Sequence, residues 1–178
     1  MKKNKLFVAA LLFASLFFVT NSNAQDVKGK NFVNAGIGLG TYGFAGTGGL
    51  PVTASFEHGF TDKISAGLYG GIIQRKYVDN FKYKYSVFGV RGSYHFNEVL
   101  NVSNPKLDVY GGLSLYYRGY SLKYDLSGDG GGTEKVTAGE VDFALHIGSR
   151  YMFSEKVGGY AELGYGISPL QLGVSLKF

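Results

Sequence analysis

The sequence predicts an all-β chain that folds as an eight-stranded antiparallel up-and-down transmembrane β-barrel. Three observations support this prediction. Large apolar residues recur at every second position in segment after segment, which is the period of a strand with two different faces. Clusters of Gly, Asn, Asp, Ser and Pro separate the segments, as turns do. The chain has 28 Gly, 14 Tyr and 14 Phe, a composition that favours closely packed strands over helices.

The first four predicted strands cover residues 31–40, 50–60, 64–76 and 83–96. The apolar face of the first holds Val33, Ala35, Ile37 and Leu39, that of the second Val52, Ala54, Phe56, His58 and Phe60, and that of the fourth Phe88, Val90, Tyr94 and Phe96. The opposite face of the fourth strand carries Arg91, Ser93 and His95. The sequence Thr61-Asp62-Lys63 predicts a tight turn from the second strand into the third.

The last four predicted strands cover residues 106–120, 138–153, 157–167 and 170–178. The apolar face of the fifth holds Leu107, Val109, Leu113, Leu115 and Tyr117, that of the sixth Val141, Phe143, Leu145, Ile147, Tyr151 and Phe153, and that of the eighth Leu170, Leu172, Val174, Leu176 and Phe178. The sequence Ser154-Glu155-Lys156 turns into the seventh strand, and Ser168-Pro169 leads to the eighth.

The connections alternate between short and long, with two exceptions. Residues 61–63 and 154–156 are short, whereas 41–49, 76–81 and 121–137 are expected to be longer loops. Short turns at one rim and long loops at the other are typical of a barrel in an outer membrane, with both termini at the short-turn rim. The segment 97–105 is long for its rim, and residues 168–169 are short for theirs.

The face opposite the apolar one decides which side points outward. It carries mainly Gly, Ser, Tyr and Thr with few charges, whereas a water-exposed face would be rich in Lys and Glu. The apolar face therefore meets lipid and the other face lines a lumen just wide enough for side chains to fill. Buried charges need partners. We predict a lumen charge network of Glu57, Glu140, Asp142 and Glu162 with Arg91, Arg150 and Lys177.

Aromatic residues concentrate near the two ends of the predicted strands. Phe60, Tyr94, Phe96, Tyr151, Phe153 and Phe178 fall near the short-turn rim, and Tyr42, Phe44, Tyr77, Tyr83, Tyr117, Tyr120, Tyr124 and Tyr165 near the other. These are candidate girdles at the two membrane interfaces, which amphipathic rings prefer.

Residues 1–24 have the pattern of a cleaved signal peptide for Sec-type export. A positive start is followed by an apolar run and by small residues at Ser22 and Ala24. Three of the 18 basic residues lie in this leader, so residues 25–178 carry 15 basic and 13 acidic side chains, a net charge of +2. This charge does not support a nucleic-acid partner. Residues 25–178 are predicted to form one domain, without disulfides because the chain has no Cys.

The last predicted strand ends on an aromatic residue. Leu172, Val174, Leu176 and Phe178 alternate to the final position, which resembles the C-terminal signal that the assembly machinery of outer-membrane barrels recognises. With the leader, the Gly-rich first strand and the segment KLDVYGGLSL, residues 25–178 resemble the small OmpA/OmpX-type barrels in their Bacteroidetes-like version. The resemblance implies a monomer in the outer membrane of a Gram-negative cell, in contact with its lipids and with that machinery.

Two motifs suggest ligand sites but lack the required context. GLGTYG at 38–43 matches a dinucleotide-binding pattern, yet the following Gly-rich and Pro-containing segment cannot start the necessary helix. Asp125, Asp129 and Glu134 offer oxygen ligands without the spacing of a calcium loop. We therefore expect a solvated loop there, and neither a cofactor nor a metal.

The functional alternatives differ in what they require of the barrel. A lipid-modifying enzyme needs a catalytic group on the lipid face near the outer rim, but His58 lies near the other rim and His95 and His146 face the lumen. A narrow pore or carrier needs a lumen lined by small residues. The many glycines of the inward face are consistent with this alternative. The sequence favours a non-enzymatic barrel with a structural or surface-interaction role.

Overall fold

The computed structural model describes the backbone of residues 27–42, 47–78, 81–125 and 133–178, with side chains except those within 77–83 and 122–137. The predicted signal peptide, and the side chains of Phe44, Tyr77, Tyr83, Tyr124, Asp125, Asp129 and Glu134, lie outside this description. The strands are β1 (Asn31–Leu39), β2 (Thr47–Gly48), β3 (Val52–Gly59), β4 (Ile64–Val78), β5 (Phe81–His95), β6 (Leu107–Asp125), β7 (Thr133–Met152), β8 (Val157–Tyr165) and β9 (Leu170–Lys177). Within the described residues, no helix is long and apolar enough to cross a membrane.

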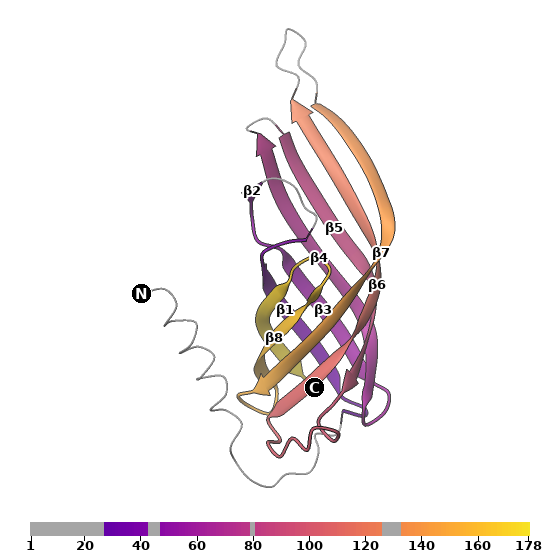
Figure 1. The fold of residues 1–178 in the computed structure, drawn as a ribbon, viewed down its shortest axis with the longest axis vertical. Helices are drawn as coiled ribbons and strands as arrows, with labels where there is room; N and C mark the ends of the chain where they lie inside the picture. Colours follow the sequence, from indigo (N-terminus) through magenta and orange to yellow (C-terminus); the bar gives the residue numbers. More distant parts are fainter. Residues whose placement is uncertain (1–26, 43–46, 79–80, 126–132) are drawn as a thin grey trace, which may run out of the picture.

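Eight of these strands close into an antiparallel barrel (Figure 1). The order around the barrel is β1, β3, β4, β5, β6, β7, β8 and β9, and β9 pairs with β1. In this closing pair, Phe32 lies opposite Lys177 and Leu39 opposite Leu170. The predicted fold class is therefore confirmed. The short strand β2 was not predicted, and it pairs with β4 at Lys76 and Arg75, beyond the end of β3.

The side chains alternate between a polar interior and an apolar exterior. On β3, Thr53, Ser55 and Glu57 are buried, whereas the outward Val52 and Phe56 are 51% and 40% exposed. The same outward exposure holds for the last strand, at Leu172, Val174, Leu176 and Phe178. A soluble protein buries its apolar face. This barrel does the reverse, which suits a wall surrounded by lipid.

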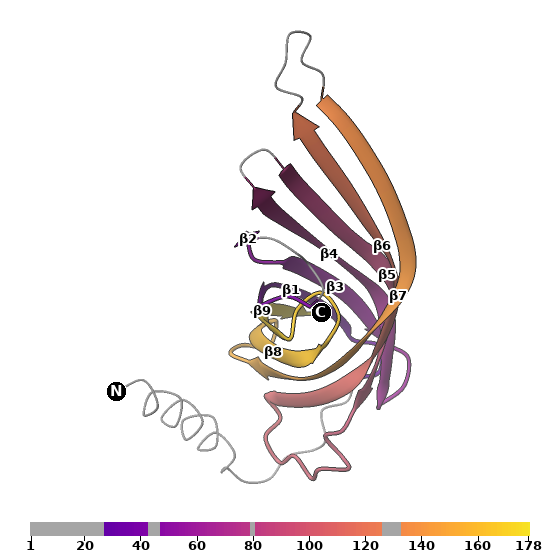
Figure 2. The same ribbon diagram turned by 45° about the horizontal axis from the view of Figure 1, so that its top comes forward.

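One side of the barrel continues far beyond its rim (Figure 2). β6 and β7 have 19 and 20 residues and β4 and β5 have 15 each, whereas the other barrel strands have eight or nine. Residues 77–78, 81–82, 121–125 and 133–137 were predicted outside the strands but are strand. They lie next to turn-forming residues, and the sequence does not reveal the continuous pairing from Leu107 opposite Tyr151 to Asp125 opposite Thr133.

The projecting part forms a four-stranded sheet with two different edges. β2 covers part of the β4 edge. β7 pairs with β8 only between Leu145 and Met152, so residues 133–144 have no strand on that side among the described residues. The projecting sheet therefore presents an open β7 edge about a dozen residues long.

The opposite rim holds both ends of the barrel chain. The backbone groups of Asn31 and Phe178 exchange two hydrogen bonds of 2.7 and 3.0 Å. The turns β3–β4 and β7–β8 are short, and the β5–β6 loop, residues 96–106, is longer. Asn97 fastens this loop, because its side-chain oxygen accepts a hydrogen bond of 2.7 Å from the backbone nitrogen of Val109. The alternation of connections is thus less regular than that of a simple barrel.

Aromatic rings pack in pairs near both rims of the apolar wall. At the rim with the chain ends the pairs are His58–Phe60, Tyr94–Phe96 and Tyr151–Phe153. At the other rim Tyr165 packs against Tyr42 and Phe143. Tyr120 was predicted for this girdle, but its ring packs against Tyr85 on the inner face of the projecting sheet. Tyr120 and Tyr117 lie on opposite faces of β6, because successive side chains alternate along a strand.

Candidate functional site in the barrel interior

An ion-pair cluster centred on Arg91 crosses the barrel interior. Arg91 on β5 donates from Nε to Glu57 on β3 at 3.0 Å, and from its two terminal nitrogens to both carboxylate oxygens of Glu162 on β8 at 2.6 and 3.1 Å. The Tyr110 hydroxyl donates to the same Glu162 at 2.9 Å. All three charged side chains are at most 2% exposed. This two-pronged geometry is the strongest that a guanidinium offers a carboxylate.

A second buried guanidinium, Arg150 on β7, lies nearer the rim with the chain ends. Its terminal nitrogen is 2.7 Å from an oxygen of Asp108 on β6. The guanidinium carbon lies 4.1 Å from the ring centre of Phe32 and 4.8 Å from that of Tyr110. Aromatic faces attract a cation, most strongly where water is excluded. The inward Phe32 therefore contacts the buried charge of Arg150, and it is a large apolar residue on a strand face that is otherwise polar or small.

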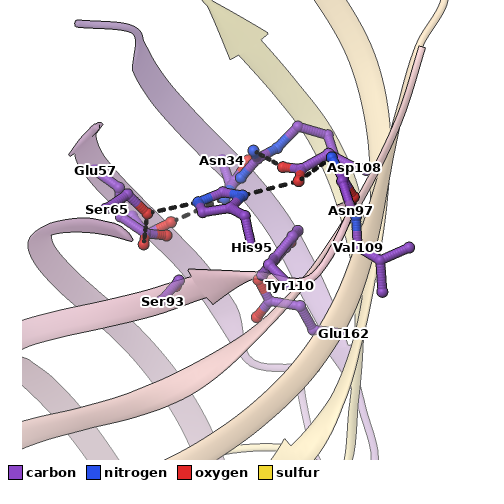
Figure 3. Close-up of polar contacts among 12 residues, drawn as sticks. Asn34, Glu57, Ser65, Ser93, His95, Asn97, Asp108, Val109, Tyr110 and Glu162 are labelled. Atoms are coloured by element: carbon purple, nitrogen blue, oxygen red, sulfur yellow. Dashed lines mark hydrogen bonds and ion pairs between the residues drawn. The ribbon is translucent and has the colours of Figure 1, made fainter. Parts of the chain in front are cut away.

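His95 links the two guanidinium groups through their carboxylates (Figure 3). Its Nδ1 is 2.8 Å from Asp108, the partner of Arg150, and its Nε2 is 2.9 Å from the hydroxyl of Ser65. Ser65 in turn donates to Glu57, the partner of Arg91, at 2.9 Å. Six strands around the barrel are therefore joined by one continuous set of polar contacts.

Ser65, His95 and Asp108 have the contacts of a Ser-His-Asp triad, but not its proton arrangement. In a catalytic triad the histidine accepts the hydroxyl hydrogen of the serine. Here the Ser65 hydroxyl donates to Glu57, and Nδ1 of His95 lies 2.8 Å from Asp108. Ser65 is also only 1% exposed, so its hydroxyl is not open to a substrate.

Each buried carboxylate of the interior lies against a guanidinium. Among the described residues, Glu57, Asp108 and Glu162 are almost completely buried, as are Arg91 and Arg150. Glu57 and Glu162 pair with Arg91, and Asp108 pairs with Arg150. Because an unpaired charge in an apolar surrounding is costly, these contacts stabilise the cluster.

An apolar layer closes the interior on the side of the projecting sheet. It consists of Tyr69, Ile73, Val87, Tyr116, Ala144 and Ile167, all at most 7% exposed. Ile167 reaches this layer from the β8–β9 connection. An internal space between this layer and the ion pairs has a volume of about 10 Å³, near the least that one water needs.

Inward glycines make room for large neighbouring side chains. A Cβ atom at Gly89 would lie 2.6 Å from the Tyr116 side chain, one at Gly148 2.6 Å from Glu162, and one at Gly173 2.7 Å from Tyr160. The glycine-rich inner face therefore does not indicate a channel. The space that a larger residue would occupy at these positions is taken by the tyrosine and glutamate side chains that fill the lumen.

The residues of the predicted charge network divide into three groups. Glu57, Arg91 and Glu162 meet at the barrel centre, and Arg150 lies beside Asp108. Glu140 and Asp142 lie instead at the base of the projecting sheet, where both contact Arg118. Lys177 is partly exposed at the rim with the chain ends. Arg118 was left out of the prediction.

The predicted network missed several interior residues that take part in these contacts: Ser65, His95, Asp108 and Tyr110. Asp108 lies on the inward face of its strand, so its position alone could have included it. The sequence does not show which buried carboxylate meets which arginine, because that depends on the strand register around the barrel. His146 also lies inside, with Nε2 3.1 Å from Ser93, while its other ring nitrogen is buried without a partner.

Comparisons with known proteins bear on the fold. No protein-family model matches the chain, and neither does any curated protein. The crystal structure of the N-terminal β-barrel domain of Pseudomonas aeruginosa OprF is similar with a TM-score of 0.50 and 17% identity, covering 85% of this chain and 98% of that one. A designed transmembrane β-barrel is similar with a TM-score of 0.51 and 13% identity, over 85% and 97%. The chain has the fold of a transmembrane β-barrel. Sequence identities this low say nothing further about activity.

Proposed function

We propose that this chain is a monomeric integral protein of the outer membrane, without catalytic activity, that presents its projecting sheet to a partner outside the cell. The observation that carries the proposal is the extension of β4–β7 beyond a barrel whose interior is filled. Strands that only cross a membrane need about 9–11 residues. The additional length of β6 and β7 has no role in crossing and places a sheet in the aqueous space beyond one rim.

The membrane assignment is supported by features at both ends of the barrel. The predicted signal peptide, the two sets of aromatic rings and the apolar outer wall fit an outer-membrane barrel of OmpA/OmpX type. The rim with the chain ends is assigned to the periplasm, because short turns and termini lie there in such barrels. The projecting sheet then faces the outside of the cell.

The open β7 edge is the part of the sheet best suited to a protein partner. An unpaired edge offers backbone donors and acceptors to a further strand, and extended peptides bind other proteins in this way. The inner face beside it carries Arg118, Glu140 and Asp142, whose charges provide polar contacts for selecting a partner.

Single cysteines test the orientation, because the natural chain has none. Lys84→Cys lies on the projecting part of β5, and the matched Ser154→Cys lies in the β7–β8 turn. A membrane-impermeant maleimide should label Lys84→Cys in intact cells and Ser154→Cys only after the outer membrane is opened. The reverse pattern, or recovery of a soluble protein, would refute the proposal.

The pore alternative is tested by current through planar bilayers. Because ion pairs and the apolar layer fill the lumen, purified protein should show no steady single-channel conductance. A mobility difference between boiled and unboiled samples on gels ensures that the barrel is folded. Regular conductance steps from folded protein would favour a pore or carrier instead.

A further inference from the structure

The outer wall of the barrel carries an apolar groove that is separate from the interior. It has a volume of about 510 Å³ and is lined by residues of β6, β7, β8 and β9 and of the loop 96–106. Its floor is the outward pair Ser149 and Ala161, which lie opposite each other, with Gly159 beside them. The volume is within the roughly 300–1,000 Å³ of small-molecule sites.

The groove exists because small residues replace large ones in one part of the wall. Farther up the same two strands, the outward pairs are Ile147 with Leu163 and Leu145 with Tyr165. Side walls come from Leu100 in the β5–β6 loop and from the ring of Phe153. A Cβ atom at Gly159 would lie 3.1 Å from that ring, so the ring lies against the glycine.

Positive charge lies at the rim end of the groove. Lys106 directly precedes β6, and Lys156 directly precedes β8, on either side of the end of β7. The backbone oxygen of Lys106 accepts a hydrogen bond of 2.8 Å from Met152, between two residues that line the groove. Both lysines are exposed, and neither has an ion-pair partner among the described side chains. Glu155 is the one acid of the adjoining turn, which leaves a net positive charge.

We propose that the groove binds one acyl chain of an anionic glycerophospholipid, whose phosphate lies between Lys106 and Lys156. A phospholipid has its apolar chains and its charged phosphate in the same order along the membrane normal as the groove and the two lysines. Lysines at a membrane surface attract anionic headgroups. The inference rests on the proposed function, which places this rim in the periplasmic leaflet.

Native mass spectrometry with added palmitoyl-oleoyl phosphatidylglycerol tests the site. The natural protein should retain one such lipid, and phosphatidylcholine with the same chains much less. Ala161→Leu fills the groove and should reduce retention at least about fivefold. The pair Lys106→Gln and Lys156→Gln should reduce it roughly tenfold, since each lysine near a membrane contributes to anionic lipid binding.

Ala54→Leu is the matched control, because Ala54 is outward and exposed on β3, away from the groove. It should bind phosphatidylglycerol like the natural protein. Equal retention by the natural protein, Ala161→Leu and the lysine variant would overturn the inference, as would equal loss in Ala54→Leu. If Ala161→Leu does not fold, the lysine variant decides alone. A folded, membrane-inserted protein without lipid preference would refute only this inference, whereas a soluble protein would refute the proposed function.

Discussion

Replacement Arg91→Met should lower the free energy of unfolding by about 3–5 kcal/mol, the usual cost of leaving buried carboxylates without their partner. Arg91 is the shared partner of Glu57 and Glu162, and both carboxylates are almost fully buried. Methionine is long enough to occupy much of the same space, so the effect reports charge more than volume. Urea unfolding in micelles followed by circular dichroism measures it, since the chain has no Trp for fluorescence.

The control for this prediction removes the carboxylates as well. The triple variant Arg91→Met, Glu57→Gln and Glu162→Gln should recover most of the lost stability, because a cluster without charges needs no compensation. Lys63→Met breaks the exposed pair of Lys63 with Glu98 and should change stability little. Equal stability of Arg91→Met and the natural protein would show that water reaches the cluster.

Replacement Gly112→Val should prevent the barrel from closing. Gly112 on β6 faces inward, and a Cβ atom there would lie 1.9 Å from the backbone oxygen of Gly92 and 2.8 Å from the Cα atom of Ser93 on β5. Backbone of a neighbouring strand cannot move aside without breaking the pairing of β5 with β6. The cost should therefore exceed the roughly 1–3 kcal/mol of ordinary overpacking.

Gly92→Val is the matched control, on the outward face of the paired strand. The nearest atom to its added Cβ would be the backbone oxygen of Ser65 at 3.9 Å, an ordinary contact. Refolding into micelles and gel mobility before and after boiling distinguish the two variants. Gly92→Val should show the folded band and Gly112→Val should not. A folded Gly112→Val would mean that the strands at this point are less closely apposed.

The sequence predicted the fold because apolar residues alternate along every strand and turn-forming clusters separate the strands. A barrel in lipid has one apolar face along each of its strands. The outer ends of β6 and β7 were predicted as a loop over residues 121–137, although Tyr120, Leu122 and Tyr124 continue the alternation. The Gly- and Asp-rich stretch that follows led to this prediction. The pairing of β6 with β7 shows that strand continues to Asp125 and resumes at Thr133.

The interior was predictable in kind but only partly in its contacts. Alternation places Glu57, Arg91 and Glu162 inside, and the need for partners predicts that they pair. The position of Glu140 and Asp142 near Arg118 depends on the height of each residue above the membrane. Height depends on strand tilt and stagger, which one sequence does not reveal.

The Arg91 cluster also has a consequence for the order of folding. Its contacts join residues 34 and 71 positions apart, on β3, β5 and β8. Neighbouring strands can pair as local hairpins long before these distant groups meet. Until β8 arrives, Arg91 lacks its two-pronged carboxylate, so an incomplete barrel holds an imbalance of charge that keeps its lumen hydrated. Arrival of the last two strands would remove that imbalance and the water together, making drying of the interior a late and cooperative event.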